Sequence, residues 1–411
     1  FTPSGSSVCN GIRHYGVGII TSVSDGAVTE AKLGSGAVTS SKIASGVIPS
    51  KRPNAIPLAY NGNMEVSQRS TSVTGITAGS DGYFTLDRFA FREGADPGAV
   101  FTMTQETLTS GNAYANGFKH ALKMDITTAD GTLGGDDFVT IEQRFEKQDL
   151  GAFKKGTANA EKFTVAFWVK ATKTGINIVE LQDHSNDRSV SAQYTVSTTD
   201  TWQHIVVTFP ADTTGNFGTG NAKGLSLRFY LLAGTGYTSG SLQTTWGSAT
   251  TNKRANGQVN NGDSTSNNWH LTGVQLEVGE YTSSTIPPFQ HESFGDNLAR
   301  CQRYCFVLTT PNGRGRFATG GFFSTQHSDV IVNFPTEMRT DYSLAYGSFG
   351  DWRLTSHTAE GTPSGINLDS SKCLTAADVR VTSATAIGTA GNYALFLSNA
   401  SGSKLIFDAE L

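Results

Sequence analysis

The chain has 411 residues and a formal net charge of −4, with basic and acidic residues well mixed, which excludes the basic footprint of a nucleic-acid-binding protein. Charged residues make up only 16%, below the average of about 25% for soluble domains, and glycine is abundant, a composition typical of all-β chains with many tight turns. No apolar stretch approaches the roughly 18 residues that a membrane span requires, so we expect neither membrane insertion nor a nucleic-acid partner.

A ten-residue repeat follows an N-terminal connector, 1–24, and occupies residues 25–53. Its copies read DGAVTEAKLG, SGAVTSSKIA and SGVIPSKRP. A single chain cannot build a core from about three apolar residues per repeat, because ordering each residue costs roughly 1–2 kcal/mol. Repeats of this kind gain stability by stacking or from partner chains, and so few copies favour partner chains. We expect a homotrimeric neck that buries Val28, Leu33, Val38 and Ile43; the alternative, a flexible linker, leaves these phased apolar positions unexplained.

Residues 54–292 contain clear alternating strands. Apolar residues recur at every second position in 163–170, 205–209 and 225–231, and 211–224 is a turn-rich loop. Such strands without a convincing long helix predict a β-sandwich of the jelly-roll type.

The last strand of this region is predicted at Trp269–Val278. Its apolar alternation changes phase at Gly273, where a β-bulge would keep both halves on one face. Pro287 and Pro288 then end the sheet, because proline cannot donate to a ladder. A linker helix is expected within 293–306, beginning after an N-cap at Asp296 and spanning 297–306.

The remaining residues, 307–411, form a second β unit, with strand-rich segments at 330–348 and 392–411. The fold class is therefore all-β: N-terminal trimeric neck repeats, a central jelly-roll β-sandwich, a short helix and a C-terminal β-sandwich tip.

The cysteines Cys9, Cys301, Cys305 and Cys373 lack the spacing of a zinc site, so we expect buried free thiols from assembly in a reducing cytosol. Cys301 and Cys305 lie four residues apart on the expected helix. With Leu298 they would face a three-fold axis, leaving Arg300 and Arg303 outside. The alternative is that this helix packs only on its own sandwich.

Catalysis is not expected from the sequence. Glycoside hydrolysis needs two carboxylates at a defined separation, and Glu142 and Glu146 in TIEQRFEKQD alternate with apolar residues as the wet face of a strand. No hydrolase, metalloprotease, P-loop or dinucleotide motif is present. His204 and His270 lie in strand-like segments and are interpreted as structural. An enzyme with a binding module, secreted and glycan-degrading, stays as an alternative.

Several segments in fixed order resemble a known family. The order is AYNGNMEVSQRS (59–70), DGYFTLDRFAF (81–91), FTVAFWVKATKTG (163–175), TWQHIVVTFPADTTG (201–215), GLSLRFYLLAG (224–234) and WHLTGVQLEVGE (269–280). This series resembles the carbohydrate-binding-module-like jelly roll of bacteriophage tail-fibre and tail-tip proteins. The decapeptides resemble the neck repeats of phage fibres, and 334–339 with the terminal FDAEL resembles their C-terminal tip modules.

The resemblance implies a homotrimeric tail fibre, assembled in the host cytoplasm and located on the virion. Its N-terminal part would attach to other tail or baseplate proteins. Its C-terminal domain, 307–411, would be the receptor-binding tip that adheres to a host surface polysaccharide or lipopolysaccharide. The alternative within the same class is a structural virion protein, a spacer or decoration, that contacts no receptor.

Candidate glycan contacts follow from the chemistry of sugar recognition, in which an aromatic ring stacks on a pyranose and polar groups select its hydroxyls. Trp246 lies in a polar loop and Trp352 in an expected turn; loop-anchoring packing is the alternative for Trp246. Arg314 and Arg316 would pair with acidic or phosphate groups, or else are solvated loop charges. Further candidates are Trp202, Tyr237, Tyr281 and His327, with a core role favoured for Trp202.

The family resemblance also implies a structural calcium ion in many related modules. Glu65 matches the first expected ligand, and Glu277 lies near the second on the last strand, where Gly273 stands in place of an aspartate. Because calcium needs several oxygen ligands and only two can be named, this departure puts the metal in doubt. No other cofactor is expected.

Overall fold

The computed structural model describes residues 28–29, 32–33, 56–310, 313–369 and 373–411. The chain divides into two compact units, Phe1–Arg52 and Pro53–Leu411. Within the first unit, Val28 and Leu33 are exposed. Val38 and Ile43 lie outside the described residues, so the trimeric neck stays a prediction.

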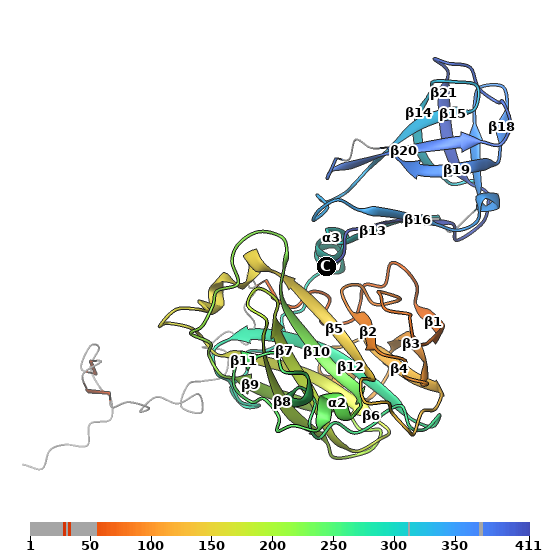
Figure 1. Cartoon of the computed structure of the whole chain (residues 1–411). Helices are drawn as coiled ribbons and strands as arrows, with labels where there is room; N and C mark the ends of the chain where they lie inside the picture. Colours follow the sequence, from red (N-terminus) through yellow and green to blue (C-terminus); the bar gives the residue numbers. More distant parts are fainter. Residues whose placement is uncertain (1–27, 30–31, 34–55, 311–312, 370–372) are drawn as a thin grey trace, which may run out of the picture. The chain divides into compact units, whose positions relative to one another are not determined.

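The expected sandwich is present as two six-stranded antiparallel sheets (Figure 1). The first sheet has the order β1-β3-β4-β12-β6-β9 and is called sheet A here. Its strands are β1 (Ser72–Ile76), β3 (Val100–Thr107), β4 (His120–Thr128), β12 (Asn268–Val278), β6 (Phe163–Ala171) and β9 (Gln203–Phe209).

The second sheet, sheet B, has the order β11-β8-β7-β10-β5-β2. Its strands are β11 (Gly247–Ser248), β8 (Arg188–Val196), β7 (Gly175–Asp183), β10 (Lys223–Ala233), β5 (Phe138–Glu146) and β2 (Ala90–Gly94). The apolar residues of the predicted alternation, such as Phe167 of β6 and Phe229 of β10, are fully buried between the sheets. Their rings meet edge to face at 4.9 Å, so the jelly-roll core is the one that the alternation predicts.

The predicted bulge in β12 is confirmed. The pairing register with β6 shifts between Thr272 and Gln275, and Gly273 has a φ of +62°. Val274 and Leu276 consequently return to the core beside Leu271.

Short helices fill the connections. They are α1 (Gly111–Ala115), η3 (Lys147–Phe153), α2 (Thr235–Thr238) and η4 (Thr251–Lys253). The segment that contains α2 and η4 lies against the outer face of sheet B, because Arg254 pairs with Glu180 of β7 and Gln243 donates to the carbonyl of Ser189 in β8.

The linker helix α3 spans Phe294–Gln302, so its predicted start, N-cap and end are wrong. The helix stops before the expected end at residue 306, and Cys305, which was expected on it, begins the next strand. The helix begins earlier than expected, and its N-cap is Ser293, whose side chain accepts a hydrogen bond from the Asp296 N–H. Asp296 lies in the first turn, where its carboxylate interacts favourably with the helix dipole. Both Ser293 and Asp296 are residue types suited to an N-cap, and the prediction took the second of them.

The helix packs on its own sandwich. Cys301 is fully buried, and Arg300 and Arg303 are not directed outward but pair with Glu292 and Glu146. The expected arrangement around a three-fold axis is therefore wrong for these residues, because carboxylates within the same chain hold both arginines. Leu298 is half-buried, and its place in a trimer stays a prediction.

The free thiols Cys301 and Cys305 are buried as expected, and burial raises the pKa of each well above its usual value. Cys373 is exposed, so the prediction of burial is wrong at that position.

The C-terminal region is a second sandwich. Its smaller sheet contains β13 (Cys305–Thr309), β22 (Lys404–Asp408) and β16 (Ser343–Tyr346). Its larger sheet has the order β18-β17-β21-β14-β15-β20-β19. These strands are β18 (Glu360–Gly361), β17 (Trp352–Thr355), β21 (Tyr393–Ser398), β14 (Arg316–Phe322), β15 (His327–Asn333), β20 (Ala376–Ser383) and β19 (Pro363–Leu368), with η5 (Phe349–Asp351) before β17. The inner faces share one core that includes Phe396 and Phe407.

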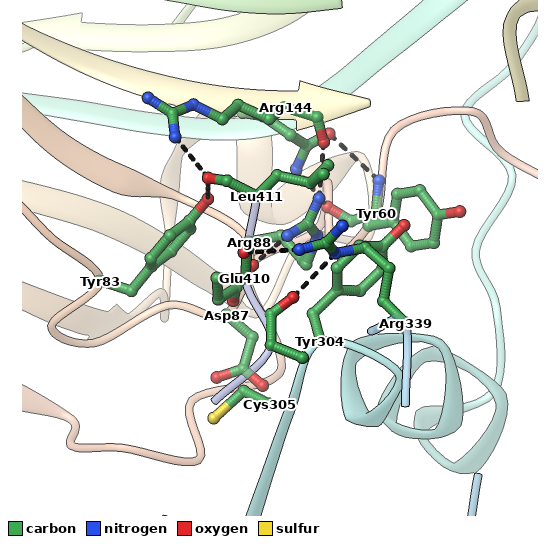
Figure 2. Close-up of polar contacts among 12 residues, drawn as sticks. Tyr60, Tyr83, Asp87, Arg88, Arg144, Tyr304, Cys305, Arg339, Glu410 and Leu411 are labelled. Atoms are coloured by element: carbon green, nitrogen blue, oxygen red, sulfur yellow. Dashed lines mark hydrogen bonds and ion pairs between the residues drawn. The ribbon is translucent and has the colours of Figure 1, made fainter. Parts of the chain in front are cut away.

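The last residues of the chain contact the jelly roll through a buried polar cluster (Figure 2). The Glu410 carboxylate pairs with the fully buried Arg88, whose guanidinium also lies over the Tyr304 ring at 3.4 Å from its centroid. Arg144 donates to the carbonyl of Leu411, and Arg339 donates to the carbonyl of Glu410 at 2.9 Å. This ion pair joins the two sandwiches, because Arg88 belongs to the jelly roll and Glu410 to the C-terminal region. Since Arg88 has no access to water, breaking the pair would leave a buried charge.

Candidate functional site

The outer face of the seven-stranded sheet carries exposed ring and charged side chains. Alternation buries Val330, Val379 and Phe396 in the core and turns their neighbours outward. The pairing of neighbouring strands aligns one outward-facing residue from each of five strands in a single row. Across the sheet, this row consists of Tyr393, Gly321, Asp329, Arg380 and Asn367.

Two aromatic rings on this face are open to solvent. Tyr393 is 51% exposed and Phe323, which follows β14, is 48% exposed. Opposite Tyr393 stands Gly321, where an added Cβ would meet only the Asn392 carbonyl at 3.7 Å. The strand beside Tyr393 therefore has an open, flat surface. Phe323 is fixed from two sides, by the His327 ring at 5.7 Å and by the Arg380 guanidinium at 4.8 Å.

Arg380 organises the polar part of the face. Its Nε donates to Asp329 Oδ1 at 2.9 Å, and its Nη2 lies 2.8 Å from Asp369 Oδ2. Asp378 lies in the next row, where burial and repulsion from Asp329 and Asp369 raise the pKa of its carboxyl. One of its oxygens, Oδ1, is buried without a hydrogen-bond partner within the described structure.

The neighbouring rows extend the surface. Ile331 of β15, 47% exposed, lies opposite Thr319 of β14. Arg316, predicted from sequence as a glycan contact, is exposed at the start of β14 and lies opposite Leu397 on the same outward side. Arg314, the other predicted arginine, pairs with Glu360 at 2.8 Å and is 64% exposed. Tyr393, Arg380, Asp329 and Arg316 thus project from strands, whereas Phe323, Arg314 and Asp369 lie in the segments next to strand ends.

This arrangement suits a ligand with both apolar and hydroxyl-bearing faces. Open tyrosine and phenylalanine rings offer an apolar plane to stack on, and the fixed carboxylates and guanidinium offer acceptors and donors beside it. Strands hold such groups more precisely than loops do.

Trp352 does not contribute to this surface, and its predicted role as an exposed platform in a turn is wrong. It begins β17, is fully buried and stacks on Phe396 at 5.1 Å in the core. The turn is η5, which ends at Asp351, and the alternation of the following strand directs Trp352 inward.

The other predicted rings serve mainly to pack the jelly roll. Trp246 is half-buried, its indole N–H donates to the Pro210 carbonyl at 2.8 Å, and its ring contacts Phe163 at 5.5 Å. This is the anchoring role that the sequence left open, and a glycan contact there stays a prediction. Trp202 is 6% exposed, as the favoured core role requires.

The calcium ion stays a prediction, and the described part of the chain adds no third acidic ligand to the proposed pair. No group of three or more histidine, cysteine, aspartate or glutamate side chains that could hold a metal ion is found there, so Glu65 and Glu277 belong to no such group. Glu277 accepts a hydrogen bond from Gln275 at 3.3 Å. Within the same residues, no helix is long and apolar enough to cross a membrane.

The prediction that Glu142 and Glu146 form a solvent-exposed face of β5 is also wrong. Glu142 and Glu146 are both fully buried. Glu146 accepts hydrogen bonds from Arg303 at 2.8 Å and from Tyr304 at 2.6 Å. Burial acts to raise the pKa of each carboxyl, but the neighbouring donors and arginines outweigh it and lower both pKa values. A carboxyl of that kind is a poor general acid.

Sequence reasoning missed Tyr393 and Phe323. The signal for Tyr393 was present, because in NYALFLS it occupies the strand phase opposite to Ala394 and Phe396. An aromatic residue in the outward phase predicts an exposed ring. Phe323 follows an equally aromatic Phe322, and nothing in the sequence tells which of the two is buried.

Comparisons with known proteins give likenesses of low score. No protein-family model matches the chain, and no curated protein matches its sequence. Among solved structures, the enzymatically active domain of tailspike protein 4 of bacteriophage CBA120 aligns with 54% of this chain at 12% identity and a TM-score of 0.28. The aligned part spans 21% of that tailspike chain.

Two smaller proteins align over most of their own length. A putative sugar-binding protein from Bacteroides thetaiotaomicron matches 54% of this chain and 100% of its own, at 12% identity and a TM-score of 0.26. A family 11 carbohydrate-binding module from Clostridium thermocellum, in complex with a mixed-linked tetrasaccharide, matches 50% of this chain and 91% of its own, at 10% identity and a TM-score of 0.25.

Proposed function

We propose that this chain is the receptor-binding part of a bacteriophage tail fibre, and that the outer face of its seven-stranded sheet binds a host-surface glycan. The single observation that carries the binding role is the pair of exposed rings, Tyr393 and Phe323, beside the charged network of Arg380. The fibre role is supported by the ordered sequence segments and the decapeptide repeats.

In this proposal the protein binds without cleaving. The two carboxylates that the sequence singled out, Glu142 and Glu146, are buried in ion pairs and serve the packing of the jelly roll. The chain would act as a homotrimer on the virion, attached through its N-terminal part to other tail proteins. Linking three weak glycan sites raises avidity through effective concentration.

The binding role is tested by applying the purified full chain to a microarray of bacterial surface glycans. We expect selective binding, and we expect Tyr393→Ala to weaken it by about 30-fold or more, as for a ring at the centre of an interface. Gly321→Val should weaken it as well, because the new side chain would occupy the open surface beside Tyr393. Phe349→Ala is the matched control, since Phe349 is an exposed ring of the same domain that contacts Tyr346.

Two results would overturn the proposal. One is the absence of binding to every surface glycan on the array. The other is binding by Tyr393→Ala and Gly321→Val that equals binding by the original chain. The trimer is tested separately by light scattering, which should give three times the mass of the chain.

A further inference from the structure

A second polar face lies on the jelly roll, on the outer side of sheet B. Register brings its residues into adjacent rows: Glu142 of β5 lies opposite Arg228 of β10, and Arg144 lies opposite Ser226. Arg228 lies in turn opposite Glu180 of β7. We call this group, with Arg92 of β2 and Lys223 of β10, the basic face.

Three guanidinium groups share one carboxylate at its centre. Arg144 Nε lies 2.9 Å from Glu142 Oε1, while the Nε atoms of Arg228 and Arg92 lie 3.5 Å and 3.6 Å from Oε2. Glu142 is fully buried, whereas each of the three arginine side chains keeps 13–16% of its surface exposed. The carboxylate thus lies beneath the cations and leaves positive charge on the accessible side.

Other carboxylates remove only part of this charge. Glu180 is bound by Arg254 through both oxygens at 2.6 Å, so it offers Arg228 only a longer contact of 3.5 Å. Asp81 pairs with Arg92 at 2.7 Å and is half exposed. Glu146 lies opposite Lys223 in the register, but it is already bound by Arg303 and Tyr304.

The positive charge of Lys223 is the clearest one on this face that no ion pair within the described chain neutralises. This lysine is half-buried, and no acidic partner for its ammonium group occurs among the described residues. Burial and the positive charge of Arg144 lower the pKa of Lys223 to about 8. Burial and the nearby Lys223 likewise lower the pKa of His184 to about 3, so this imidazole stays neutral and bonds Ser226 at 2.7 Å.

We propose that the basic face is a second binding site, which accepts an anionic group carried by a glycan, a uronate carboxylate or a sugar phosphate. Lys223 and Arg228 would contact the anion, and Glu142 would hold Arg228 in position, while Arg144, which donates to the Leu411 carbonyl, adds positive charge beside them. The guanidinium group of arginine and the ammonium group of lysine are the side-chain groups that bind such oxygens best. The inference rests on the proposed function only in that a glycan carries the anion, since the site is separate from Tyr393.

The test is calorimetric titration of the full chain with trigalacturonate and with glucose 1-phosphate, using galactotriose as the neutral probe. We expect one or both anionic probes to bind, and we expect galactotriose to bind at least tenfold more weakly at this site. The affinity for the anionic probe should fall with added salt. Lys223→Gln should weaken the anionic probe about tenfold or more, and Lys223→Arg should retain binding. Lys162→Gln is the matched control, an exposed lysine paired with Glu280.

The pH profile gives a readout that a merely structural role would not change. Affinity should fall as pH rises through about 8, because Lys223 loses its proton there. Over this range Glu142 stays ionised and His184 stays neutral, because the pKa of each is lowered. In Lys223→Arg the fall should be absent.

Failure to bind either anionic probe, or equal affinity in Lys223→Gln, would overturn this proposal. So would a flat pH profile in the unchanged chain. None of these results bears on the glycan face around Tyr393, whose test uses other variants, so the two proposals fail independently.

Discussion

The outer faces of two sheets, sheet B of the jelly roll and the seven-stranded sheet of the C-terminal sandwich, are built by the same alternation but differ in what covers them. On sheet B, Glu142 and Ser226 are fully buried and linked to each other by a hydrogen bond. On the C-terminal sheet, Tyr393 and Ile331 are about half exposed. The comparison teaches that strand phase decides which side a residue faces, whereas the side chains and segments around it decide whether that residue meets solvent.

The largest loss of stability is expected when the ion pair that couples the two sandwiches is broken. Arg88→Ala should lower the free energy of unfolding by about 3–5 kcal/mol, because the buried Glu410 would keep only its longer contact with Arg69, at 3.5 Å. Urea unfolding measures this. The double variant Arg88→Met, Glu410→Gln should recover part of the loss; a single variant that loses less than about 1 kcal/mol would contradict a coupled junction.

The contrast between buried and exposed rings gives the next test. Trp352→Ala should cost about 3–5 kcal/mol of stability, since it removes a fully buried ring from the C-terminal core. Tyr393→Ala, in the same domain, should change stability by no more than about 0.5 kcal/mol. Thermal unfolding of both variants separates them, and a similar loss in Tyr393→Ala would show that its ring is a packing residue.

The smallest effect is expected at Arg314. Its ion pair with Glu360 is exposed on both sides, so Arg314→Ala should change stability by less than about 1 kcal/mol. If Arg314 contacts the glycan, as the sequence suggested, the same variant should weaken binding on the array without affecting unfolding. An unchanged array signal would restrict the face to the rows of Arg316 and Tyr393.

Much of the fold was predictable because alternation and turn chemistry are local. The strands around Phe167 and Phe229 and the bulge at Gly273 were read from spacing alone. The failure at β5 has one cause, which is that spacing does not show what covers a face. Glu142 was assigned to solvent because it alternates with Ile141, and nothing in the sequence shows that Arg92, Arg144 and Arg228 surround it.

The candidate site was less predictable than the fold. Trp352 was chosen for its residue type and polar neighbours, while Tyr393 was overlooked although its strand phase predicted exposure. Arg380 lies in β20 and Asp369 follows the end of β19, and only the register of the sheet brings them together. Distant partners of this kind cannot be derived from spacing in one sequence.

The most direct test of the account is hydroxyl-radical footprinting of the full chain, with and without a glycan that the array identifies. We predict that Tyr393 and Phe323 become protected on binding, while the exposed ring of Phe349 does not change. Protection at Trp246 with none at Tyr393 and Phe323 would contradict the account and move glycan binding to the jelly roll.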